Sequence, residues 1–183
     1  MGTLFVDNIK QQSSQGSGTI TIGASGETVS FASGVTGTNY PAFEAHSDSN
    51  QSLTDNTYAK VALQTEVLDT NSNFDSSSNY RFTPTVAGKY YIEGQARGSG
   101  SNNDTLRNVY AAIYKNGSLY KESRINFQPN EIELCAIQVS AIIDMNGSSD
   151  YVELYAAVDI TSGSASLSEG TKANYFLGYR LGT

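Results

Sequence analysis

The chain has little of what catalytic and disulfide-stabilised proteins rely on: its 183 residues include no tryptophan, one cysteine, one histidine and three prolines. With Cys135 alone, no internal disulfide can form, and because it lies in an apolar strand pattern we expect a buried, inert thiol. His46, which we expect in a polar loop, has no second His to complete a zinc site, and the single Cys lies far away in sequence. Its neighbours Ser47 and Asp48 resemble a catalytic triad in composition only, since triad members must converge in space. We therefore expect no enzymatic activity.

Charge is also sparse. Asp, Glu, Lys and Arg make up 16% of the chain, the net charge is −7, and the 11 basic residues are scattered. Binding to nucleic acid or to anionic membranes needs clustered Lys and Arg, so neither partner is expected. No apolar run approaches the roughly 20 residues of a membrane helix. The start, MGTLFVDNIK, shows no secretory signal pattern, so we expect neither membrane insertion nor a signal peptide.

Tyrosine, glycine and short alternating apolar runs are abundant, with 12 Tyr and 17 Gly. The stretch 74–98 is predicted to form two strands joined by a corner, because Pro84 ends the first strand and Gly88 permits a turn. In the second strand the alternation predicts two faces. Tyr90, Ile92 and Ala96 are expected to face the interior, and Tyr91, Glu93 and Arg97 to face outward or a neighbouring subunit.

Further strands are predicted along the rest of the chain, with polar loops at 47–56, 99–108 and 161–172. Asn116-Gly117 between two alternating runs predicts a type I′ hairpin. We predict that 132–143, apolar on both faces, pairs with 150–158 in a longer hairpin. Eight to ten short strands without a helix indicate an all-β sandwich, most naturally a jelly roll. The other predicted strands are 41–45, 58–68 and 173–181.

Residues 1–39 differ in composition from residues 40–183, and we predict a domain boundary between them. Ala24-Ser25-Gly26 recurs as Ala32-Ser33-Gly34 between short alternating pairs. Two small hairpins are marginal alone, so this segment is either a flexible linker or several chains wound together. The alternating Ile, Val and Phe favour the intertwined alternative.

Several motifs in the larger domain, taken in order, resemble those of the C1q/TNF-like jelly roll over residues 40–183. The resemblance rests on Phe74-Asp75, Phe82-Thr83-Pro84, Val86 to Tyr91, Lys115-Asn116-Gly117, the predicted pairing of 132–143 with 150–158, and Tyr175 to Tyr179. In the last of these, Tyr179 replaces the usual final Phe of a Phe-x-Gly-Phe motif. The resemblance implies a homotrimer. Candidate core or trimer-interface residues are Phe43, Phe82, Tyr90, Ile137, Val139, Tyr155, Tyr175, Phe176 and Tyr179.

The N-terminal stretches LFVDNIK and TITIGASGETV resemble short fibre and tail-associated proteins of bacteriophages. This resemblance implies a homotrimeric virion protein that docks on other virion proteins through residues 1–39 and carries its head outward. Collagen-like Gly-X-Y repeats, common before C1q heads in animals, are absent. Candidate virion-attachment residues are Leu4, Phe5, Val6, Ile9, Ile20, Ile22, Val29 and Phe31.

The leading functional hypothesis is a non-catalytic short tail fibre or spike that adheres to a host-surface glycan or protein by multivalent contacts. Recognition is expected in polar loops such as 99–108 or 161–171. One alternative is a capsid decoration or cement protein, or a tail adaptor, without receptor binding. The other is a glycan-cleaving tailspike, which needs paired carboxylates on a groove.

No cofactor is expected, and calcium remains an alternative. The loop Asp144 to Asp150 supplies oxygen ligands but lacks the spacing of an EF-hand, and turn chemistry explains it without an ion. The strand tyrosines suit either the core and trimer axis or saccharide contacts, and we favour the first.

Overall fold

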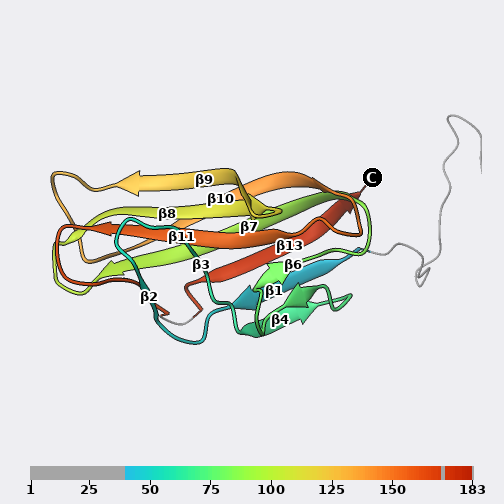
Figure 1. The fold of residues 1–183 in the computed structure, drawn as a ribbon, viewed down its shortest axis with the longest axis horizontal. Helices are drawn as coiled ribbons and strands as arrows, with labels where there is room; N and C mark the ends of the chain where they lie inside the picture. The colour runs from blue at the N-terminus through green and yellow to red at the C-terminus, as the bar shows by residue number, and fades with distance from the viewer. Residues whose placement is uncertain (1–39, 170–171, 183) are drawn as a thin grey trace, which may run out of the picture. The chain divides into compact units, whose positions relative to one another are not determined.

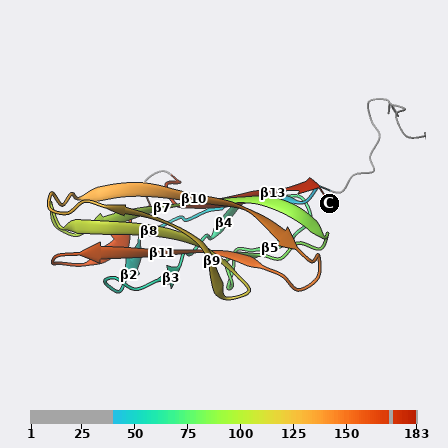
Figure 2. The ribbon, with the colours of Figure 1, turned by 90° about the horizontal axis from the view of Figure 1, so that it is seen from above.

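The computed structural model describes residues 40–169 and 172–182, so the predictions for residues 1–39 lie outside the described residues. The described part is all-β, as predicted, with two antiparallel sheets packed face to face (Figures 1 and 2). Eight strands have five residues or more, and five have two or three. Within residues 40–169 and 172–182 we find no helix suited by length and hydropathy to cross a membrane.

Seven strands form sheet A and six form sheet B. Sheet A runs β2–β12–β7–β13–β1–β4, with β10 on the other side of β7, and sheet B runs β5–β6–β11–β8–β9, with β3 also paired to β11. The strands of sheet A are β1 (Ala42–His46), β2 (Gln51–Leu53), β4 (Thr65–Asp69), β7 (Gly88–Gly100), β10 (Leu134–Met145), β12 (Ala165–Leu167) and β13 (Tyr175–Gly182). Those of sheet B are β3 (Ala59–Lys60), β5 (Phe74–Asp75), β6 (Arg81–Phe82), β8 (Leu106–Lys115), β9 (Ser118–Asn126) and β11 (Val152–Ile160).

A single apolar core fills the space between the sheets. Phe43 stacks on Phe82 with ring centroids 4.3 Å apart, and Phe176 meets Phe43 edge-on at 5.1 Å. At Gly94 the sheets approach so closely that an added Cβ would lie 2.5 Å from a methyl carbon of Leu154. A side chain at this position would force Leu154 to move, so glycine allows the two sheets to pack this closely.

The predicted corner at 74–98 is confirmed, because β6 belongs to sheet B and β7 to sheet A. Burial along β7 alternates as expected. Tyr90, Ile92 and Ala96 are fully buried, whereas Tyr91, Glu93 and Arg97 are half-buried on the outer side. The Tyr90 hydroxyl donates to the carbonyl of Val86 at 2.7 Å, which ties the corner to the strand that follows it.

One predicted hairpin is confirmed and the other is wrong. β8 pairs with β9 around Asn116 and Gly117, whose φ angles of 52° and 77° fit a type I′ turn. The segments 132–143 and 150–158 do not pair. β10 pairs with β7 and β11 pairs with β8, so the turn between them crosses from sheet A to sheet B.

Three smaller expectations also needed correction. The segment 58–68 is two strands in different sheets, β3 and β4, and Val61 and Leu63 are buried where the chain crosses between them. The polar loops predicted at 47–56 and 161–172 contain β2 and β12, which pair with each other. His46 ends β1 and is buried, instead of lying in a polar loop.

The sandwich has two ends that differ in what they hold. β1 begins and β13 finishes at one end (Figure 1). There the amide of Arg180 donates to the carbonyl of Pro41 at 3.0 Å. We call this the proximal end. The opposite, distal end holds the connections β7–β8, β9–β10 and β11–β12 (Figure 1). The chain therefore enters the sandwich at residue 40 far from the distal loops.

Candidate functional site

The residues selected from sequence as core or interface candidates fall into two groups. Five are fully or almost fully buried between the sheets: Phe43, Phe82, Tyr90, Val139 and Phe176. Ile137 is partly buried against the same core. Three tyrosines lie on outer faces instead: Tyr155 on sheet B, and Tyr175 and Tyr179 on sheet A.

On the outer face of sheet B the tyrosine rings pack against one another. Tyr114 and Tyr155 stack with centroids 4.1 Å apart, and Tyr58 packs on both Tyr110 and Tyr114 at 5.8 and 6.3 Å. The Tyr58 hydroxyl donates to Glu122, and burial followed by this hydrogen bond raises the pKa of Tyr58 above its ordinary value. Little ring surface is left here for stacking on a sugar.

Charged groups on the same face are also paired. The Lys60 ammonium lies 2.5 Å from the carboxylate of Glu153, a residue that is only 3% exposed. Asn108 donates to Asp159 and accepts from the Arg124 guanidinium at 2.9 Å, while Arg124 also lies over the ring of Tyr110. The outer face of sheet B is thus internally satisfied.

The outer face of sheet A, formed by β10, β7, β13, β1 and β4, is more open. One cross-strand row holds Ile142, Tyr91 and Tyr179, and the next holds Glu93 and Leu177. Ile142 is 59% exposed and Tyr179 is 47% exposed. Leu68, Leu181 and Tyr40 are further large exposed side chains around this face. Large exposed apolar side chains gathered on one face are typical of interaction surfaces.

Glu93 is at the centre of this face and is held by hydroxyl groups. The Tyr91 hydroxyl donates to one carboxylate oxygen at 2.6 Å and the Tyr175 hydroxyl to the other at 2.9 Å. Gln138 donates to the Tyr175 hydroxyl at 2.6 Å. The hydrogen bond to Glu93 raises the pKa of Tyr91, and burial and then Glu93 raise that of Tyr175. Among residues 40–169 and 172–182, no cationic side chain lies within ion-pair distance of Glu93.

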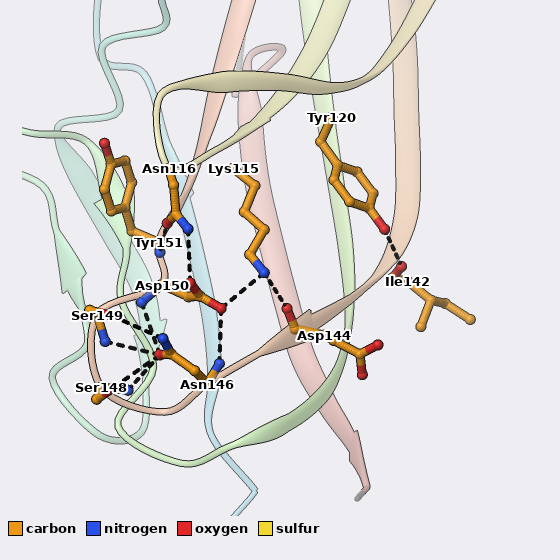
Figure 3. A network of polar contacts seen from close by, with 10 residues as sticks. All are labelled: Lys115, Asn116, Tyr120, Ile142, Asp144, Asn146, Ser148, Ser149, Asp150 and Tyr151. Atoms are coloured by element: carbon orange, nitrogen blue, oxygen red, sulfur yellow. Dashed lines mark hydrogen bonds and ion pairs between the residues drawn. The ribbon is translucent and has the colours of Figure 1, made fainter.

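A second exposed apolar surface follows the side of the sandwich where β9 and β10 run next to each other, which we call the β9/β10 edge. Leu119, Tyr120 and Ile125 are exposed there, on β9. The Tyr120 hydroxyl donates to the carbonyl of Ile142 at 3.3 Å, joining the edges of the two sheets (Figure 3). Both strands pair on one side only within the described chain, so each presents an unprotected edge.

The proximal loop 144–150 is organised by its own hydrogen bonds. The side-chain oxygen of Asn146 accepts the amides of Ser148, Ser149 and Asp150, and Asp150 accepts from Asn116 and Lys115 at 2.8 and 2.9 Å (Figure 3). These donors, Asn116 first, lower the pKa of Asp150. Nowhere in the described chain do three His, Cys, Asp or Glu side chains gather as a metal site would need.

The distal loops are polar, exposed and tied to one another. Their exposed parts are 101–104, 128–130 and 161–164, with 54–57 beside them. The amide of Ser101 donates to the carbonyl of Ser164 at 3.0 Å, and the amide of Gly100 donates to the carbonyl of Glu133 at 3.1 Å. Sequence reasoning selected 99–108 and 161–171 but missed 128–130, because nothing in the sequence shows that β9–β10 returns to the same end.

Neither His46 nor Cys135 has the surroundings of a nucleophile or base. The His46 Nδ1 contacts the carbonyl of Ser47 at 3.1 Å and the carboxylate of Asp48 at 3.5 Å, and no hydroxyl nucleophile is shown against the ring. Cys135 is half-buried in β10, and burial raises the pKa of its thiol. A raised pKa disfavours the reactive thiolate.

Comparison with known proteins locates the fold. No family model and no curated protein matches the sequence. Solved structures do match: murine APRIL at TM-score 0.57 with 9% identity, covering 78% of this chain and 100% of that one. The Eiger TNF of S. frugiperda matches at 0.53 with 10% identity, covering 78% and 91%. The globular domain of zebrafish complement 1qA matches at 0.50 with 13% identity, covering 78% and 98%. At such identities the likeness shows the fold alone, and that fold is the C1q/TNF-like jelly-roll sandwich.

Proposed function

We propose that the chain is a non-catalytic, homotrimeric binding module that forms the head of a short virion fibre or spike and adheres to a host surface through its distal loops. The observation that carries the proposal is the contrast between the outer faces of the two sheets. Sheet B satisfies its own rings and charges, whereas sheet A and the β9/β10 edge expose large apolar side chains.

The two exposed apolar surfaces differ from each other, and this difference favours a ring. When two unlike patches of the same chain pair, the contact is head-to-tail, and repetition closes into a cyclic oligomer if the rotation permits. The outer face of sheet A and the β9/β10 edge are such a pair, separated by the width of β10. The C1q/TNF-like resemblance implies that three subunits close the ring.

Attachment and recognition are proposed at opposite ends. The described chain begins at the proximal end, and the distal loops lie at the opposite end of the sandwich. Three rigidly tied, polar loops per subunit, repeated three times, offer a multivalent surface in which weak contacts add up to avid binding. The resemblance of residues 1–39 to phage fibre starts supports docking on other virion proteins.

Native mass spectrometry of the full chain tests assembly directly. At micromolar concentration we expect a species of three times the 19.6 kDa of one chain. A monomer across the micromolar range would overturn the proposal. Adhesion is then tested by labelling the chain with a fluorophore and measuring its binding to cells that the particle infects. The double variant Ser101→Arg/Ser164→Arg, altered in the distal loops, is compared with the unmodified chain. Trimeric variant protein that binds as well as the unmodified chain would remove the distal loops from recognition.

A capsid decoration or cement role is the second candidate. It rests on the same proposed trimer interface and does not need the distal loops to bind a receptor. Gold-labelled antibodies against residues 40–183, applied to purified particles, separate the two. Label at the tail tip or collar supports adhesion, and label at capsid lattice points supports decoration. Particles without label contradict the virion location itself.

A further inference from the structure

Two charged side chains of opposite sign lie unpaired on the two surfaces proposed to meet. Glu93, on the outer face of sheet A, is held by neutral hydroxyls and has no cation within ion-pair distance among the described residues. Lys121, exposed on β9 beside Tyr120, has no carboxylate within that distance in the same part of the chain. Other lysines nearby are engaged, since Lys89 pairs with Asp144 and Lys115 with Asp150.

The two charges also lie at the same height along the sandwich. Tyr120 is fixed to Ile142 by its hydroxyl (Figure 3), and Ile142 is the cross-strand partner of Tyr91. Glu93 is two residues beyond Tyr91 on the same face of β7, and its cross-strand partner is Ser140. Lys121 pairs with Ile113 in sheet B, and Ile113 pairs with Leu154, whose side chain packs against Gly94, the residue after Glu93. The backbone of Lys121 therefore lies close to the height of Glu93.

Equal height matters because of symmetry. In a closed ring each subunit is rotated about the axis without being shifted along it, so contacting residues of neighbouring subunits share one height. If the axis runs along the strands, the β9/β10 edge of one subunit meets the outer face of sheet A of the next at matching rows. Ile142, Tyr91 and Tyr179 then supply the apolar surround, and Lys121 meets Glu93.

Resting on the proposed trimer, we propose that Lys121 of each subunit forms an ion pair with Glu93 of a second copy of this chain, and that this pair sets the orientation of the ring. Covering sheet A removes water from a carboxylate that has no counter-charge of its own, and such a burial is unfavourable unless a cation accompanies it. The clamp of Tyr91 and Tyr175 holds the carboxylate in one geometry for that cation.

The test is a charge-reversal cycle measured by light scattering across a dilution series of the full chain. Lys121→Glu and Glu93→Lys are each expected to raise the subunit concentration at half-assembly by about tenfold or more. The double variant Lys121→Glu/Glu93→Lys restores opposite charges and is expected to return to within about threefold of the unmodified chain. High salt should reduce the difference in half-assembly concentration between the single variants and the unmodified chain, because it screens the charges.

Controls separate the pair from folding and from net charge. Lys172→Glu makes the same charge change at a second exposed lysine, outside the proposed pair, and should change assembly much less than Lys121→Glu. Glu93→Gln keeps the size of the side chain and its acceptor oxygen, and should weaken assembly in the same direction as Glu93→Lys. Circular dichroism verifies that every variant is folded.

The outcomes are distinguishable. If the unmodified chain is trimeric and the single variants assemble like it, or the double variant is no better than the singles, the ion pair is overturned and the trimer stands. If the unmodified chain is monomeric at micromolar concentration, the trimer fails and the pair fails with it.

Discussion

Tyrosine and glutamate line both outer faces of the sandwich, yet their surroundings differ. On sheet B, Glu153 meets Lys60 at 2.5 Å and Tyr155 stacks on Tyr114. On sheet A, Glu93 meets tyrosine hydroxyls, and Tyr179 remains 47% exposed. Similar residues are therefore paired with one another on the outer face of sheet B but remain exposed on the outer face of sheet A.

The difference comes from one connecting segment. The chain between β2 and β4 adds β3 to sheet B beside β11 and brings the side chains of Tyr58 and Lys60 onto the outer face of that sheet. In the described chain no comparable segment lies over the Glu93 region of sheet A, where exposed apolar side chains remain. Residue composition alone therefore does not identify an interface. What matters is whether other side chains of the same chain pack against the exposed rings and pair with the charges.

The largest expected effect is on sheet B. Lys60→Ala leaves Glu153, 3% exposed, as a buried carboxylate without its cation, and should lower the free energy of unfolding by about 3 kcal/mol. Urea denaturation at a fixed protein concentration measures it. The matched control is Lys172→Ala, whose lysine is exposed and forms no ion pair in the described chain, and which should leave the free energy of unfolding unchanged. Equal losses for both variants would contradict the contrast between the faces.

The next effect is on association through sheet A. Tyr179→Asp places a charge in the open row of Ile142 and Tyr91, so we expect trimer formation to weaken by roughly a hundredfold. The isolated subunit should lose less than about 1 kcal/mol, since Tyr179 is largely exposed. Light scattering and urea denaturation give the two numbers. Tyr155→Asp on sheet B should do the opposite: it should lower the free energy of unfolding of the subunit and affect trimer formation less. If Tyr179→Asp leaves trimer formation unchanged, the outer face of sheet A is not part of the interface.

A smaller effect isolates one hydroxyl. Tyr58→Phe removes the hydrogen bond to Glu122 and keeps the ring packed on Tyr110 and Tyr114, so a loss of about 1 kcal/mol is expected. Thermal unfolding followed by circular dichroism measures it. Tyr179→Phe is the counterpart on sheet A, where the structure gives that hydroxyl no hydrogen bond to a described residue, and its unfolding should match the unmodified chain.

The smallest expected effect belongs to neither face. Asn116 and Lys115 lower the pKa of Asp150, so its carboxylate stabilises the fold above the ordinary aspartate pKa of about 3.9, and this contribution is lost as pH falls below it. Asp150→Asn should cost less than about 1 kcal/mol at pH 7 and almost nothing near pH 2. Urea denaturation at several pH values tests the trend, and a loss that stays constant with pH would contradict it. Trimer formation should be unaffected.

Local chemistry is what the sequence revealed well. Alternation along β7 correctly separated Tyr90 from Tyr91, because a strand between a core and an outer face imposes a period of two. Asn116-Gly117 correctly predicted a hairpin, because these residues accept positive φ. Both inferences depend on neighbours within a few residues.

Pairing at long range could not be predicted in the same way. A short turn such as 146–151 serves a hairpin or a crossover equally well, so β10 and β11 were wrongly paired. Alternation assigns faces but does not choose the partner strand. The distinction between Tyr155 and Tyr179 could not be predicted for the same reason, since it depends on β3 pairing with β11 and bringing Tyr58 onto the outer face of sheet B.

The shared position of residues 40 and 182 has a practical consequence. Because the amide of Arg180 bonds the carbonyl of Pro41, a short linker would join the two ends of the sandwich without strain. New ends opened in the exposed loop 161–164 would then emerge at the distal end. Such a circular permutant would reverse the polarity of display, presenting the proximal loops outward, and the domain could equally be inserted as a cassette into a surface loop of another protein.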